Sequence, residues 1–476
     1  MRFRKRNGLF VLLACVATFL IVQSNQPIPA GMAPASLVIA QSALPYAGVP
    51  SCSARSCHGA NFPAPEGRLL RNEYTLWVET DPHAQAYAAL FNERSARIMK
   101  NLSQSGTPRS AHQDVRCLAC HVEPHAASSN AMAYLRVDGV GCEACHGPAR
   151  QWLDPHTSPV MWDAYSPAQR NQMGMVDVKN PAILAKICAN CHVGAPADAT
   201  TRLPLRDVDH DLLSAGHPRL NFEFATYLAN LPRHWKEPAA SVEQTQGTAA
   251  RSWAVGQVAS AKAALNLLVD RVDRAGSSTD AGTWPEFAEY DCSSCHHGLT
   301  TPALRQRVAG TPGSFGRASW GNWYLTGPAR LLSASPKEAA SFEPLARFLE
   351  QPMPPLTRTK VLATEAIKSL QGLESGVLSR EPLALRTQVM ERLAAANPPT
   401  NRLSWELAEQ FSLTAGLLRN GRFRSAPATR EFSPAAIELF GKLAYPKGTD
   451  ERESFYWDDK FERQFKAMLG EQPGPK

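Results

Sequence analysis

Apolar and polar residues along this chain follow helical rather than strand periodicity. The clearest stretch is 249–272, where apolar side chains recur every three to four residues, so we expect one long amphipathic helix there. Long alternating runs of β-branched residues are absent, and few strands are predicted. Further helical segments, separated by Pro, Gly or Asn, are predicted at 337–350, 358–371, 382–396, 403–418, 433–443 and 458–469.

The N-terminus has the pattern of an export signal. Four basic residues precede an apolar stretch at 9–22, which is short for a membrane span and typical of the apolar part of a signal peptide. We predict that 1–40 is a signal peptide or a retained N-terminal anchor, followed by a linker over 41–50. The formal net charge of +7 depends on this leader, and without its four Lys and Arg residues about +3 remains.

Ten of the 11 cysteines fall into five motifs that end in Cys-His. Four motifs read Cys-x-x-Cys-His, the attachment signature of c-type haem, in which both thiols add to the haem vinyl groups and the histidine binds iron. Zinc is less favoured, because zinc sites do not require His directly after the second Cys. We predict five covalent haem c groups, attached through Cys52, Cys57, Cys117, Cys120, Cys142, Cys145, Cys188, Cys191, Cys292 and Cys295, with His58, His121, His146, His192 and His296 as proximal iron ligands.

The first motif is widened, with four residues between Cys52 and Cys57. Either both thiols are attached or Cys57 alone is. Five haems within 51–300 leave too few residues for separate pockets, so we expect a mainly α, loop-rich multihaem core of short helices. Residues 301–476 are predicted to be a helical accessory region, either a separate domain or a coat on the haem core.

The second axial ligand of each iron decides between electron transfer and chemistry at an open site. His83 and His156 each follow Asp-Pro and are predicted as distal ligands, with His83 opening a helix that runs to about Leu102. His210 and His217, seven residues apart, fall on one helix face and are further candidates. Weaker candidates are His112 and His125, whereas His234 is expected at an interface and His297 points away from iron.

Three segments carry a family resemblance: GVGCEACHGPA at 139–149 with His156 after it, DPHAQAY at 81–87, and HDLLSAGHPRLNFEF. They resemble the cytochrome c-554 family, whose type member is a tetrahaem electron carrier. The resemblance covers roughly 50–300 and implies haem ligation by the motif residues, with distal ligands at His83, His156 and the His210–His217 segment. The chain departs from the family in having five sites and a widened first motif.

The sequence therefore predicts an exported, periplasmic pentahaem cytochrome that passes single electrons between a donor and an acceptor protein. It could be tethered by its N-terminus or be a subunit of a membrane complex. The haem propionates would offset its positive charge, so nucleic acid is not an expected partner. The alternative is a reductase or oxidase of a small nitrogen or sulfur compound at one open iron.

Overall fold

The computed structural model describes most of the chain from Tyr46 onward. The described residues are 46–67, 69–103, 109–237, 240–277, 282–292, 295–296, 318–333, 342–395, 405–420, 463, 465–467 and 469. The predicted leader and most of the linker lie outside these residues, as do His297 and the helices expected at 433–443 and, for the most part, at 458–469. No helix among the described residues is long and apolar enough to cross a membrane.

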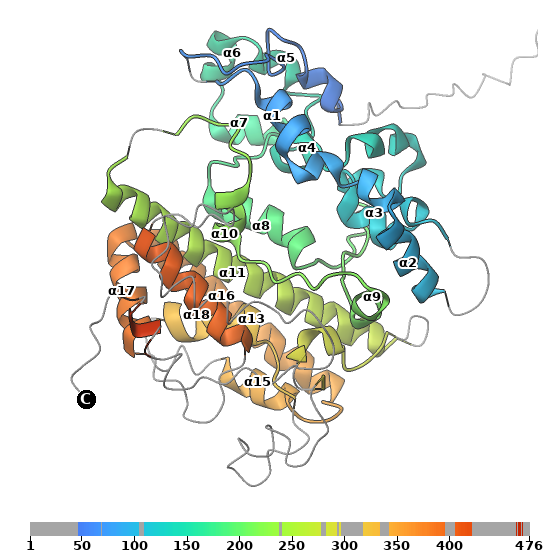
Figure 1. The fold of residues 1–476 in the computed structure, drawn as a ribbon, viewed down its shortest axis with the longest axis vertical. Coiled ribbons are helices and arrows are strands. Elements are labelled where there is room, and N and C mark those ends of the chain that lie inside the picture. Colours follow the sequence, from blue (N-terminus) through green and yellow to red (C-terminus); the bar gives the residue numbers. More distant parts are fainter. Residues whose placement is uncertain are drawn as a thin grey trace, which may run out of the picture. The chain divides into compact units, whose positions relative to one another are not determined.

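The fold is mainly α, as expected, and β pairing in the described part of the chain is limited to three isolated antiparallel bridges. Up to residue 240 the elements are short (Figure 1). The α-helices are α1 (Glu73–Thr80), α2 (Glu93–Leu102), α3 (Val115–His121), α4 (Cys142–His146), α5 (Leu153–His156), α6 (Pro159–Ala164), α7 (Pro167–Gln172), α8 (Pro181–His192), α9 (His210–Ala215) and α10 (Phe224–Asn230). Between them lie the 3₁₀ turns η1 (Val49–Cys52), η2 (Pro82–Gln85), η3 (Ala88–Phe91), η4 (Ala111–Gln113), η5 (Pro124–Ala126) and η6 (Asn130–Asp138).

Local capping explains why these helices are short and well separated. Asp114 accepts a hydrogen bond from Arg116 N at the start of α3, and Asn180 accepts one from Ala182 N at the start of α8. Side-chain oxygens at these positions satisfy backbone N–H groups that the first turn leaves unpaired. Each cap thus starts a helix at a fixed residue and sets the direction of the motif at its other end.

The prediction of a single helix from His83 to Leu102 is wrong. The structure divides this segment into η2, η3 and α2. Asn92 has an extended backbone and its side chain caps α2 by accepting from Ser95 N, so α2 begins there. The break leaves His83 in a separate turn, where it is free to face a different haem motif.

The long helix is confirmed as α11 (Val242–Ala275), which extends past both predicted ends. It is not simply amphipathic, because every residue from Ser252 to Ala261 is buried. The reason is that α11 packs on both sides: α8 and α10 contact it, and so do α16 (Leu356–Ser379), α17 (Pro382–Ala395) and α18 (Trp405–Asn420) (Figure 1). A helix enclosed in this way needs no polar face over its middle turns.

The remaining elements are shorter and complete the C-terminal part. They are η7 (Phe287–Glu289), α13 (Asn322–Thr326), the π-helical turn η9 (Gly327–Leu332) and α15 (Glu343–Leu349). One hydrophobic core runs from Ala185 on α8 through α11 to Leu418 on α18 and Phe465. Smaller cores lie among residues 46–135, around Ile98 and Leu212, and around Trp152 and Trp162. The helices after residue 340 therefore pack directly on the element that also supports the fourth motif.

Candidate haem sites

The second, third and fourth Cys-x-x-Cys-His motifs each end a helix. They close α3, form all of α4, and close α8. Residues three and four apart lie on one face of a helix, so both thiols and the imidazole of a motif project to the same side. This arrangement lets the two thiols bond to the vinyl groups of one haem while the imidazole binds its iron.

The widened first motif lies in a tight loop rather than a helix. Cys57 N and Gly59 N both donate to the Ala54 carbonyl, at 2.9 and 3.0 Å. A Cβ on Gly59 would lie 1.9 Å from the Ser53 carbonyl oxygen, so this loop closes only with glycine after the histidine. The two extra residues are thereby accommodated while His58 keeps its place beside Cys57.

None of the ten motif cysteines forms a disulfide, and motifs lie close to one another. The Cys52 and Cys142 thiols lie close enough together to shift each other's pKa, and so do those of Cys120 and Cys191. Burial raises the pKa of Cys145 to about 12, so its thiol stays protonated at neutral pH. The first motif thus adjoins the third, and the second adjoins the fourth.

Four of the five motif histidines lie opposite a second histidine. The ring centroids are 6.0 to 6.5 Å apart in every case. The pairs, with their separations, are His58 and His156 (6.3 Å), His192 and His83 (6.0 Å), His146 and His234 (6.3 Å), and His296 and His210 (6.5 Å).

This spacing fits an iron atom between two imidazoles. A ring nitrogen lies about 1.1 Å from its ring centre and binds a first-row metal at about 2 Å, so trans imidazoles have centroids about 6.2 Å apart. Direct ring stacking would bring the centroids nearer, as it does for His112 and Phe91 at 4.3 Å. Among the described residues, no group of three or more His, Cys, Asp or Glu side chains is arranged to hold a metal ion by itself.

In three of these rings, those of His58, His83 and His156, Nδ1 is hydrogen-bonded to a neighbouring oxygen. Nδ1 of His58 lies 3.0 Å from Glu73 Oε2, and Nδ1 of His83 lies 2.9 Å from Asp81 Oδ1. These hydrogen bonds raise the pKa of both histidines. His156 Nδ1 likewise donates to its own helix, at the Leu153 carbonyl. An Nδ1 donor bond fixes the ring and leaves Nε2 for a metal, as outer partners of metal-binding histidines usually do.

Burial keeps the motif histidines of the third and fourth motifs uncharged. It lowers the pKa of His146 to about 4, helped by the charge of His234, and lowers the pKa of His192 to about 4. Both imidazoles are therefore neutral at pH 7. Neutral imidazole is the form that binds iron.

His121 differs from the other motif histidines. Its Nδ1 lies 2.8 Å from the Ala86 carbonyl, but none of the described histidines pairs with its ring. His217 is the histidine placed near it: burial lowers the pKa of His217, and the charge of His121 lowers it further. The structure thus brings His217 toward the second motif without placing the two rings at the 6 Å spacing of the other pairs.

Of three further histidines, His234, His112 and His125, only His234 faces a motif histidine. His234 was expected at an interface, yet its ring faces His146. The only local signal is a proline two residues earlier, weaker than the Asp-Pro before His83 and His156. His112 stacks on Phe91, and His125 hydrogen-bonds the Tyr46 hydroxyl, so neither faces a motif histidine.

A buried carboxylate ties the start of the described chain to the third motif. Glu143, inside that motif, accepts hydrogen bonds from Ala47 N, Gly48 N and Ala149 N at 2.9, 2.7 and 2.6 Å. These bonds hold the segment just before Cys52 against α4. The first motif is thereby positioned beside the third.

Paired cysteines, an adjoining histidine and a facing second imidazole are the features expected of a c-type cytochrome, a class whose haem transfers electrons. Residues 51–147, which contain the first three motifs, match the family model described as cytochrome c554 and c-prime. The chain is therefore similar to that family over this segment. No curated protein and no solved structure matches the chain.

Proposed function

We propose that this chain is an exported pentahaem cytochrome that passes single electrons between redox proteins through closely packed, mostly bis-histidine haems. The observation that carries the proposal is the set of four histidine pairs at iron-spanning distance. The family match to a c-type cytochrome supports it over the first three motifs.

Each haem has an assigned set of holding residues in this proposal. Haem iron, when bound, supplies a one-electron Fe(III)/Fe(II) couple. Numbering sites by motif, the histidines that would hold the iron are His58 and His156 at site 1, His121 with His217 nearby at site 2, His146 and His234 at site 3, His192 and His83 at site 4, and His296 and His210 at site 5.

Close packing of the motifs supports conduction along the chain of sites. The contact between Cys52 and Cys142 joins site 1 to site 3, and that between Cys120 and Cys191 joins site 2 to site 4. Sites 3 and 4 are linked by Asp81, which hydrogen-bonds His83 and lies near enough to His234 for its charge to lower the Asp81 pKa. We infer the order 1–3–4–2 for these four sites.

Ligand type sets the expected potentials. Histidine on both sides of iron gives low potentials, whereas Met/His ligation raises them. We therefore propose a low-potential carrier located in the periplasm, with a donor and an acceptor protein as partners. Family members are typically exported, which is consistent with the basic and apolar leader of this chain.

The second candidate function is reduction or oxidation of a small nitrogen or sulfur compound. It is favoured by one observation, the absence of a ring partner for His121 among the described residues. An iron held there without a second protein ligand would have a position open to a substrate.

Electron paramagnetic resonance of the oxidised holoprotein separates the two functions. A pure carrier gives low-spin signals, with at most one high-spin haem that ignores added nitrite, hydroxylamine or cyanide. A stoichiometric high-spin signal that shifts with those compounds would replace the carrier proposal by the enzyme.

A further inference from the structure

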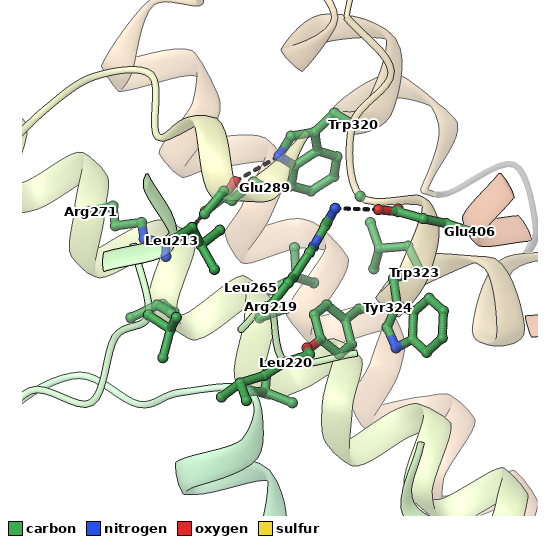
Figure 2. A pocket seen from close by; sticks show the side chains of 17 residues that line it. Leu213, Arg219, Leu220, Leu265, Arg271, Glu289, Trp320, Trp323, Tyr324 and Glu406 are labelled. Carbon is green, nitrogen blue, oxygen red and sulfur yellow. Dashed lines mark hydrogen bonds and ion pairs between the residues drawn. The ribbon is translucent and has the colours of Figure 1, made fainter. Parts of the chain in front are cut away.

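A cluster of buried charges lies beside the fifth motif, outside the segment that matches the cytochrome family. Its centre is Arg219, which follows α9 in the chain. One nitrogen of its guanidinium, Nη1, lies 2.5 Å from Glu406 Oε1 and 3.1 Å from Cys292 Sγ. A single nitrogen thus contacts both a carboxylate of α18 and the sulfur of Cys292. Figure 2 shows the Arg219–Glu406 pair.

Glu406 is almost completely buried, at 4% exposure. Its side chain hydrogen-bonds Asp291, the residue before Cys292. Burial raises the pKa of Glu406 well above its usual value, and the negative charge of Asp291 adds to this, whereas Arg219 opposes it.

The remaining titratable groups around Glu406 do not neutralise it. Glu409, one helical turn along α18, has a buried Oε2 without a hydrogen-bond partner in the described structure, and burial raises its pKa to about 7. Tyr324 of α13 is held to the Leu220 carbonyl. The cluster therefore contains three carboxyl groups and one guanidinium.

A cavity of about 80 Å³ separates this cluster from a second one. On its other wall Arg271 pairs with Asp207 and Glu289, and Glu289 also accepts from Trp320 Nε1 at 2.6 Å (Figure 2). The charges of that wall are matched by hydrogen bonds. On the Arg219 side, by contrast, three carboxyl groups lie around one guanidinium, and Glu409 Oε2 has no hydrogen-bond partner in the described structure.

We propose that Glu406 is a proton-binding site coupled to the redox state of the haem on Cys292 and Cys295. An electron arriving at this haem adds one negative charge next to the Arg219 guanidinium. The carboxylate of Glu406 then takes one proton from solvent, so that one electron and one proton enter together and leave together on oxidation. The cavity gives water a place beside the carboxyl groups.

The sign of the expected pH effect follows from this balance. Because protons bind more tightly to the reduced protein, raising the pH disfavours reduction and lowers the midpoint potential of this haem. Full coupling of one proton to one electron changes the redox equilibrium tenfold per pH unit, which is 59 mV. The other four haems, which lack this carboxyl group, should show a smaller dependence.

The test is a potentiometric titration of the full holoprotein at pH 6, 7 and 8, followed by haem absorbance. In the wild type, one of five transitions should shift by up to tenfold in its equilibrium per pH unit. Glu406→Gln should remove most of this shift, and Glu406→Asp, which keeps a carboxyl group, should retain it. Glu374→Gln, at a carboxylate of α16 paired with Lys262, is the matched control and should behave as wild type.

Redox-induced infrared difference spectra of the wild type give a second readout that needs no variant. Reduction should produce a protonated-carboxyl band that Glu406→Gln removes. The proposal is overturned, even if the variants fail to fold, when no redox transition of the wild type depends on pH in this way or when its spectra lack that band. An unchanged slope in Glu406→Gln does the same.

The inference rests on the proposed function, since it requires a haem at the fifth motif. The two can fail separately. Mass spectrometry of the peptide containing Cys292 and Cys295 shows whether haem is attached there. Its absence defeats the pentahaem proposal, whereas its presence with a pH-independent potential defeats only the role of Glu406.

Discussion

Replacing His234 tests whether facing histidines are iron ligands at a position that sequence reasoning assigned to an interface. In His234→Ala the ring opposite His146 is lost, and with it a partner whose centroid lies 6.3 Å away. Alanine cannot bridge that gap or donate to a metal. One haem in five should therefore lose its second protein ligand and become high-spin.

The effect on the fold should be small by comparison. His234 is only half-buried, and its Nδ1 makes one 3.2 Å contact with the Pro232 carbonyl. Replacing a residue so placed costs about 1 kcal/mol of the free energy of unfolding. Spin state, not stability, is thus the property that changes.

The assay is electron paramagnetic resonance of the oxidised protein, with the high-spin signal integrated per molecule. We expect an increase of one high-spin haem in His234→Ala, reversed by added imidazole, which can occupy the vacated position. His112→Ala is the control, because His112 stacks on Phe91 and faces no motif histidine. The reasoning is refuted if His234→Ala gives no new high-spin haem or if His112→Ala gives an equal one.

Three further predictions follow from the described contacts. Changing both Cys52 and Cys57 to Ala should lower the haem count by one, as measured by mass spectrometry, and changing Cys52 alone should leave the count at five if Cys57 suffices for attachment. Leu370 is fully buried on α16, in the core shared with α11. Leu370→Ala should therefore lower the free energy of unfolding by about 2–5 kcal/mol, as measured by denaturant titration. A loss of less than about 1 kcal/mol would mean that these helices do not share one core. Glu143→Ala should lower the free energy of unfolding by about 1–3 kcal/mol for each of the three N–H groups that it leaves without an acceptor. The variant should be cleaved faster by protease in the segment before Cys52. An unchanged cleavage rate would contradict the anchoring role of Glu143.

The local arrangement of the second, third and fourth motifs could be predicted from the sequence, because the motif is local. A cysteine, a second cysteine three residues on and a histidine next to it share one helix face whatever surrounds them, as α4 shows. The mainly α fold was likewise predictable from periodicity, and α11 was located to within seven residues at its start (249 against 242) and three at its end (272 against 275).

The distal half depends on contacts between distant parts of the chain. His234 lies 88 positions from His146, and no local pattern announces which motif it will face. The burial of α11 on both sides was also unpredictable from its own residues, since it follows from packing against α8 and α16. The break at Asn92 was missed for a local reason: a single side-chain cap overrode an otherwise continuous helical pattern.

The central claim is that five motifs, including the widened first one, each carry a covalent haem. Intact-mass measurement of the purified mature protein tests it most directly, with peptide mapping to place each haem. The account predicts the polypeptide mass plus five haems, with Cys292 and Cys295 among the modified residues. A mass with four haems, and Cys52 and Cys57 both unmodified, would contradict it.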